Sequence, residues 1–250
     1  YLNSPESSVF HKQRELYGLY EARKQNATLD MLVLVEGYMD VVSLFQYGIN
    51  YAVATLGTAS SQFHLEKIFR HTSRLVVCFD GDEAGEKAAQ RLLETALPAM
   101  QDGREISFLF LPEGEDPDTF IRNKGKQAFA HALDTAKPLE ELLFETEQEN
   151  TSLDSDAGKA RFNNKLLKRL TSLPNGFFKQ SQLKKLAALT GTDISLLQSR
   201  LDEYSQNKTP PQKTELANNS QAQSVATKPA RPSSSPPSNI SDQNEQTIFV

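Results

Sequence analysis

The chain has 250 residues, of which 38% are hydrophobic and 24% charged, as in a globular protein of one or two domains. A net charge of −5 argues against a uniformly basic nucleic-acid binder, although a metal site made of carboxylates would itself carry negative charge. Apolar runs such as Met31–Val35 are far shorter than the roughly 18 residues of a membrane span, so no membrane association is expected. With one cysteine and four histidines, the chain cannot hold a zinc ribbon of its own.

The first 111 residues show two patterns. Residues 1–30 are expected to form a loop and a helix from Val9 to about Gln25, at the end of a subdomain that begins before Tyr1. Apolar runs then alternate with helical segments, which is typical of a mostly parallel α/β sheet. The predicted strands are Met31–Val35, Tyr51–Thr55, Leu75–Phe79 and Ile106–Leu111, and the predicted helices between them are Tyr38–Tyr47, Gln62–His71 and Glu83–Met100.

The second half of the chain contains a helical region followed by a polar region rich in proline. Residues 113–204 are predicted to form a small helical subdomain, with Lys165, Lys168 and Arg169 on solvent-facing helix positions. From residue 205 to 250, Gln, Asn, Ser and Pro dominate, and such a segment cannot bury enough apolar surface to fold. It is predicted to be a disordered linker.

Acidic clusters follow three of the four predicted strands. They begin at Glu36, at Asp80 and at Glu115. Because functional groups of an open parallel sheet gather at the carboxyl ends of its strands, these clusters are expected to meet. Carboxylate oxygens are the ligands that Mg²⁺ prefers, which makes Glu36, Asp80 and Asp82 candidate metal ligands. The alternative is that Asp80 or Asp82 only caps the helix that follows.

Four motifs carry a resemblance to the Toprim domains of bacterial replicative DNA primases. The resemblance covers roughly Tyr1 to Leu143 and is weak from there to Tyr204. The motifs are Glu36-Gly37-Tyr38-Met39-Asp40, Leu56-Gly57-Thr58-Ala59, Asp80-Gly81-Asp82 and Gly114-Glu115-Asp116-Pro117-Asp118.

The resemblance implies a Toprim domain over residues 31–112, with a mostly parallel central sheet flanked by helices. It implies that Glu36, Asp80 and Asp82 are catalytic and bind Mg²⁺ or Mn²⁺. It places three further acidic residues along the same site, and it implies that two cations contact the phosphates of the nucleotide or the template. These are Asp40, Asp116 and Asp118 for the acids, and Lys12 and Arg14 for the cations.

The function implied is the synthesis of RNA primers from NTPs on a single-stranded DNA template, by a monomer at the replication fork in the bacterial cytoplasm. A zinc-binding domain and a domain that binds the replicative helicase would lie outside residues 1–250, and without its N-terminal half this chain is expected to be catalytically weak. Two alternatives stay open. Another Toprim enzyme, a topoisomerase or nuclease, would need a separate cleavage domain, and a non-catalytic DNA-binding module would be expected to lose the acidic residues, all of which are present.

Overall fold

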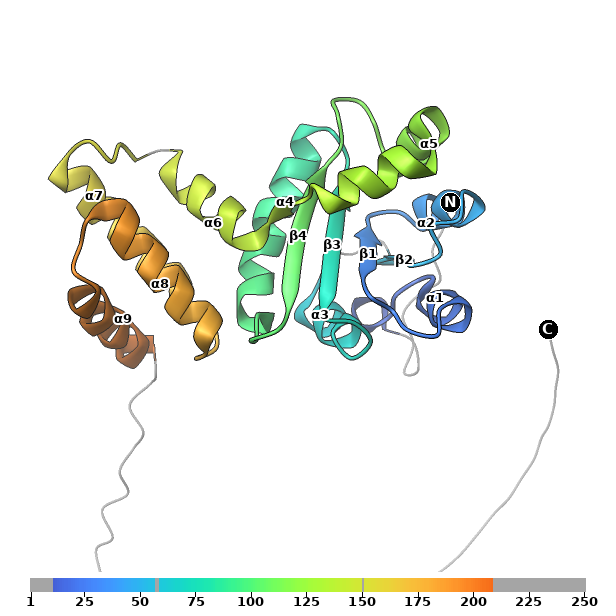
Figure 1. Ribbon diagram of the computed structural model, residues 1–250. Helices are drawn as coiled ribbons and strands as arrows, with labels where there is room; N and C mark the ends of the chain where they lie inside the picture. The colour runs from blue at the N-terminus through green and yellow to red at the C-terminus, as the bar shows by residue number, and fades with distance from the viewer. Residues whose placement is uncertain (1–10, 57–58, 150, 209–250) are drawn as a thin grey trace, which may run out of the picture. The chain divides into compact units, whose positions relative to one another are not determined.

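The computed structural model describes residues 11–56, 59–149 and 151–208 (Figure 1). The predicted linker of residues 205–250 begins too early, because residues 205–208 continue helix α9, and its remainder from residue 209 lies outside the described residues. Gly57 and Thr58 of the second motif also lie outside them, together with the expected start of the first helix at Val9.

A five-stranded sheet in the order β2-β1-β3-β4-β5 forms the centre of the fold. Strands β1 to β4 pair in parallel, and the last strand pairs antiparallel with β4. The strands are β1 Leu32–Val35, β2 Ala52–Ala54, β3 Arg74–Phe79, β4 Glu105–Phe110 and β5 Lys137–Pro138. The four parallel strands confirm the predicted mostly parallel sheet. Strand β5 was not predicted, because two residues that include a proline carry no strand pattern of their own.

Helices follow the strands and fill the rest of the described chain. Those of the first half are α1 Leu19–Gln25, α2 Tyr38–Gln46, α3 Gln62–Ile68, α4 Glu83–Ala96 and α5 Pro117–Asp134. Those of the second half are α6 Leu139–Gln148, α7 Asp156–Leu170, α8 Phe177–Thr190 and α9 Ile194–Lys208. Short 3₁₀ turns lie at Lys12–Arg14 (η1) and Leu97–Ala99 (η2). None of the helices within the described ranges combines the length and the apolar character needed to cross a membrane.

The long helix predicted to end near Gln25 is wrong over most of its described part. After η1 the chain is extended, and Tyr17 pairs with Ala54 through a backbone N–H to O distance of 2.9 Å in one direction and 3.1 Å in the other. Gly18 then turns with a φ of +81°, a conformation that favours glycine, and α1 begins only after it. The pairing with a distant strand end outweighs the local helical pattern of residues 15–18.

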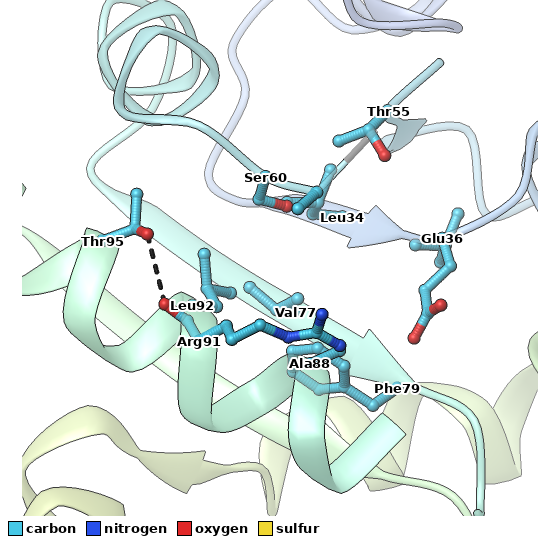
Figure 2. Close-up of a pocket in the computed structure, with 12 residues that line it drawn as sticks. Leu34, Glu36, Thr55, Ser60, Val77, Phe79, Ala88, Arg91, Leu92 and Thr95 are labelled. Atoms are coloured by element: carbon cyan, nitrogen blue, oxygen red, sulfur yellow. Dashed lines mark hydrogen bonds between the residues drawn. The ribbon is translucent and has the colours of Figure 1, made fainter. Parts of the chain in front are cut away.

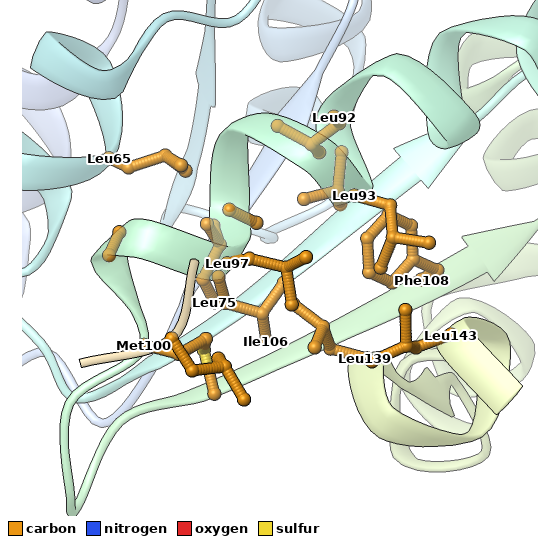
Figure 3. Packing of buried hydrophobic residues seen from close by; sticks show 14 of the residues in the cluster. Leu65, Leu75, Leu92, Leu93, Leu97, Met100, Ile106, Phe108, Leu139 and Leu143 are labelled. Atoms are coloured by element: carbon orange, nitrogen blue, oxygen red, sulfur yellow. The ribbon is translucent and has the colours of Figure 1, made fainter. Parts of the chain in front are cut away.

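Both faces of the sheet are covered, which explains why its strands are continuous apolar runs. Successive side chains of a strand point to opposite faces. On one face, Leu75 and Phe108 pack in a buried cluster with residues of α3, α4 and α6, as Figure 3 shows around Leu93 and Leu143. On the other face, strand residues such as Val76 pack with residues of α2 and α5.

The helices after α6 share the first of these apolar clusters, so the described helical part has no separate core. Phe144 on α6 meets Phe162 on α7 edge to face, with ring centroids 6.2 Å apart. Arg169 on α7 donates to Glu94 on α4 at 2.7 Å and to Glu147 on α6 at 2.8 Å. Apolar packing and one arginine therefore connect the helical part to the helix that covers the sheet.

Helix α8 depends on a carboxylate from another part of the chain, and this dependence should be sensitive to pH. The two oxygens of Asp102 accept the backbone N–H groups of Phe177 and Phe178 at 2.9 and 2.8 Å, which lowers the pKa of that carboxyl. A lowered pKa stabilises the fold above the carboxyl's ordinary pKa, and this contribution is lost as the pH falls through the lowered value. Asp102→Ala is thus expected to lower the free energy of unfolding at pH 7, by a difference that shrinks towards pH 3.

Urea unfolding of the two proteins at several pH values measures this difference. Asp102→Asn is the matched control, because it keeps one acceptor oxygen but cannot titrate. A deficit in the alanine variant that is constant with pH would contradict the role of the ionised carboxylate.

Candidate active site

The end of β1 places two acidic residues at the edge of the sheet. Glu36 directly follows the strand and is exposed. Gly37 precedes α2, and its backbone N–H donates to the Asp40 carboxylate at 3.1 Å. Asp40 is held in the first turn of α2 by this bond, which fixes its position relative to the strand end.

The end of β3 forms the turn Asp80-Gly81-Asp82, which leads into α4. The Asp82 carboxylate accepts the Gly85 backbone N–H at 2.7 Å and so caps α4. Asp82 therefore caps the helix, as the capping alternative expects, and whether it is only a cap is not decided by this bond. A cap uses only one of the two carboxylate oxygens, so this contact and a ligand role are compatible.

The turn after β3 is bonded directly to the acidic loop after β4. The Gly81 N–H donates to the Glu115 carbonyl, and the Gly114 N–H donates to the Gly81 carbonyl, both at 3.0 Å. A Cβ atom at Gly81 would overlap the Pro112 carbonyl and lie 2.7 Å from that of Leu111. Two of the acidic clusters are thus held at a fixed separation by backbone bonds that only glycine permits.

Asp116 and Asp118 lie at the start of α5. Asp116 caps this helix by accepting the Thr119 N–H at 2.6 Å. Asp118 accepts the hydroxyl of Ser43 on α2 and is paired with Arg122 one turn further along α5. The helices after β1 and β4 are therefore linked through Asp118 at the acidic edge of the sheet.

The pKa of Asp40 shows that these clusters share one electrostatic environment. This pKa is raised to about 6, first by burial and then by the charges of Asp80, Asp116 and Asp118, while the hydrogen bond from the Gly37 N–H lowers it in part. These three residues come from the other two strand ends. The folded chain thus brings together acidic groups that lie up to 78 positions apart in the sequence, from Asp40 to Asp118.

Glu36 belongs to the same environment. Its pKa is raised, first by burial and then by Asp80 and Asp82, and it is lowered in part by Arg91. The pKa of Asp80 is likewise raised by burial and by the charges of Asp116 and Asp82. Burial is the larger cause of both raised pKa values, and the neighbouring carboxylates add to it because like charges disfavour the ionised form.

Glu36 and the Asp80–Asp82 turn line different cavities. Glu36 lines a cavity of about 350 Å³ between β1, β3 and α4, and Figure 2 shows it on the opposite side from Arg91, whose guanidinium reaches across the cavity. Asp80 and Asp82 line a second cavity of about 340 Å³. The sequence did not single out Arg91, because it is one of several charged residues on an amphipathic helix and only the folded sheet places it opposite Glu36.

The donor atoms fit an open magnesium site and not a closed protein cage. Across the described ranges, no group of three His, Cys, Asp or Glu side chains lies close enough to hold one ion. Mg²⁺ usually takes one or two carboxylates and completes its shell with water and substrate phosphate. Hard oxygen donors that repel one another at a strand edge suit such a site, because a cation would offset their repulsion.

Lys12 and Arg14 lie on η1, beside α3. The Lys12 carbonyl is 3.1 Å from Nε2 of His64, and the Arg14 carbonyl accepts Nζ of Lys67 at 3.1 Å. The Arg14 guanidinium lies over the ring of Phe63, 4.9 Å from its centroid. These contacts anchor the turn to α3, and the cation that acts on Glu36 is Arg91.

Comparison with known proteins agrees with this architecture. A family model described as Toprim-like matches residues 33–121, and one described as the DnaB-helicase binding domain of primase matches residues 143–195. The DNA primase of Escherichia coli K12 is 45% identical over 216 residues, which is 85% of this chain and 37% of that protein. The chain therefore spans little more than a third of the length of this curated relative.

Two solved structures of primase domains are similar to this chain in sequence and in fold. A DNA primase domain from Pseudomonas aeruginosa is 44% identical with a TM-score of 0.77, over 82% of this chain and 63% of that one. A DnaG primase catalytic domain bound to single-stranded DNA is 48% identical with a TM-score of 0.71, over 75% of this chain and 60% of that one.

The helicase-binding match falls on residues 143–195, in the helical part, where the sequence alone suggested no such role. The Toprim-like match covers β1 to β4 and all six acidic residues considered above. It confirms the predicted Toprim fold, a mostly parallel sheet followed by a helical part. By sequence and by structure, the chain is homologous to the catalytic core of the bacterial DnaG-type DNA primases.

Proposed function

We propose that this chain is part of an enzyme that synthesises RNA primers on single-stranded DNA during DNA replication. The observation that carries the proposal is the meeting of acidic groups from three strand ends at one edge of the sheet. Backbone bonds join Gly81 to Glu115 and Gly114 there, and the Ser43 hydroxyl joins α2 to Asp118. Homology to primases supports a role for this acidic cluster in primer synthesis. One similar primase domain was solved with single-stranded DNA bound.

The reaction is nucleotidyl transfer. The 3′-hydroxyl of the growing RNA attacks the α-phosphate of an incoming NTP, and pyrophosphate leaves. Glu36, Asp80 and Asp82 would supply the carboxylate ligands for Mg²⁺ or Mn²⁺, one or two to an ion, with water and phosphate completing its shell. The bound metal would orient the triphosphate and offset its charge. No side-chain nucleophile takes part in this transfer.

The protein's own contribution is the positioning of the acidic groups. Gly81 fixes the β3 turn against the β4 loop, and Asp82 holds the first turn of α4 in register with that turn. Asp40, Asp116 and Asp118 add negative charge around the site and retain the metal there. Lys12 and Arg14 contact phosphates of nucleotide or template.

The proposed partners follow from the same assignment. They are the template strand, NTPs and the RNA primer, together with a replicative helicase that contacts the region of residues 143–195. The enzyme would act as a monomer at the replication fork in the bacterial cytoplasm. The homology to primases supports this assignment over a topoisomerase, a nuclease or a non-catalytic DNA-binding module.

The test is ribonucleotide incorporation by the intact protein that contains this chain, on a single-stranded DNA template without a primer. Short products that require Mg²⁺ or Mn²⁺ and are destroyed by alkali are the expected result. Residues 1–208 alone are expected to make far less product. Relaxation or cleavage of DNA without ribonucleotide incorporation would instead favour a topoisomerase or nuclease.

A further inference from the structure

A groove runs along α4, away from Glu36. The cavity of about 350 Å³ that holds Glu36 shares Arg91 with a neighbouring cavity of about 410 Å³. That second cavity shares Glu94 and Arg169 with a third of about 520 Å³. Because each cavity has lining residues in common with the next, the three form one continuous surface, the α4 groove, which leads from Glu36 to the face of α7. Its charged residues are Glu36, Lys87, Arg91, Glu94, Glu147, Lys165, Lys168 and Arg169.

The α4 groove is positively charged, in contrast to the chain as a whole. Five of its charged side chains are cations and three are carboxylates, whereas the chain carries a net charge of −5. The cations recur at helical spacing, with Lys87 and Arg91 one turn apart on α4 and Lys165 and Lys168 one turn apart on α7. They therefore point to the groove side of both helices. Only the folded chain brings the cations of α4 and those of α7 to one surface.

The five cations divide into two groups by their existing contacts. Arg169 is bonded to Glu94 and Glu147, so its charge is used to hold α7 against α4 and α6. Lys87 is likewise paired, with Glu83 at 2.5 Å. Arg91 is exposed and uses only its Nε, which donates to the Lys87 carbonyl at 3.1 Å. The Nη atoms of Arg91 and the Nζ atom of Lys168 have no hydrogen bond or ion pair with any described residue. Nζ of Lys165 has only a hydroxyl, that of Thr151, at 3.5 Å.

We propose that the α4 groove binds the sugar–phosphate backbone of single-stranded DNA, with Arg91, Lys165 and Lys168 contacting phosphates. The proposal rests on the proposed function, because the groove would give the template strand a path to the acidic edge, where the incoming NTP is joined to the growing RNA. These three cations have N–H donors that are not used within the described part of the chain, and they line an open concave surface. Such donors can bind the oxygens of phosphate groups.

The geometry favours one strand over a duplex. The cavities follow one another in a single row, so they offer one line of cations, whereas a duplex presents two backbones across its groove.

The test measures how salt weakens DNA binding. A fluorescein-labelled 20-nucleotide single strand is titrated with residues 1–250 at several NaCl concentrations, and anisotropy gives the dissociation constant at each. The triple variant Arg91→Gln/Lys165→Gln/Lys168→Gln is expected to lower the slope of log K against log salt by about 2, because each phosphate that a cation neutralises on a single strand adds about 0.7 to that slope. The matched control Arg23→Gln/Lys24→Gln/Lys184→Gln removes the same charge from exposed positions on α1 and α8 and should leave the slope unchanged.

Each other outcome contradicts the proposal in a distinguishable way. Equal slopes for the two triple variants would show that binding depends on total charge. Weakened binding seen only with an RNA–DNA hybrid probe would overturn the assignment to a single strand, and absence of binding by the unmodified chain would overturn the α4 groove as a DNA site. None of these results bears on ribonucleotide incorporation by the intact protein, which tests the proposed function separately. Thermal unfolding of both variants verifies that they are folded.

Discussion

The double substitution Asp80→Asn/Asp82→Asn is expected to lower primer synthesis by the intact protein by about 1,000-fold or more. The metal's stabilisation of transition-state charge amounts to several kcal/mol, and each 1.4 kcal/mol corresponds to about tenfold in rate. Asparagine keeps the acceptor oxygen that caps α4 through Gly85, so the turn should keep its shape. Removing two charges should not destabilise the fold, because burial and then repulsion among the carboxylates raise the pKa values of Glu36 and Asp80.

A second Asp-x-Asp turn in the same chain supplies the control. Asp154-Ser155-Asp156 is exposed and also precedes a helix, α7, which is capped by the Ser155 side chain. Asp154→Asn/Asp156→Asn should retain primer synthesis, and both double variants should retain the thermal unfolding midpoint. In isothermal titration calorimetry, the heat of Mg²⁺ or Mn²⁺ binding should disappear only in the variant at Asp80 and Asp82. Activity retained in that variant would remove the turn from the catalytic site.

Gly81→Ala is expected to destabilise the protein by about 3 kcal/mol and to reduce primer synthesis as well, because overpacking against fixed backbone forces both loops apart. The added methyl group would overlap the Pro112 carbonyl, which belongs to the chain backbone and cannot rotate away as a side chain could. Moving the loops apart also breaks the two 3.0 Å bonds that join Gly81 to Glu115 and Gly114. Urea unfolding measures the first effect and ribonucleotide incorporation the second.

Gly114→Ala separates the steric effect from backbone strain. Gly114 lies in the partner loop with a φ of +77°, and a Cβ atom there meets nothing within 4 Å. Its replacement should cost about 1 kcal/mol, from the left-handed backbone alone. If Gly81→Ala proved no more destabilising than Gly114→Ala, the close approach of the two loops would not be what sets the position of the acidic residues.

The sequence predicts the sheet well, because its strands are buried on both faces and so stand out as apolar runs such as Leu75–Phe79. The acidic residues that come together could also be predicted, since the carboxyl ends of parallel strands meet at one edge. The site roles given to Glu36, Asp80 and Asp82 stay predictions.

Features that depend on pairing between distant segments could not be predicted in the same way. Strand β5 exists only because β4 offers it an edge, and Tyr17 is extended only because it pairs with Ala54. The position of Arg91 opposite Glu36 depends on how α4 packs across the sheet. Such features have no local pattern of residues to reveal them.

The continuous apolar cluster from the sheet to α9 has a consequence for how the protein comes apart. When one core spans several elements, opening any of them exposes the others, and the elements unfold as a single cooperative unit. Phe108 on β4, Phe162 on α7 and Leu201 on α9 all belong to this cluster. Backbone amides of α7 should therefore exchange with solvent through the same global opening as those of β4. A pulling force applied to α7–α9 would therefore be transmitted to the sheet and its acidic edge before these helices could separate from the sheet.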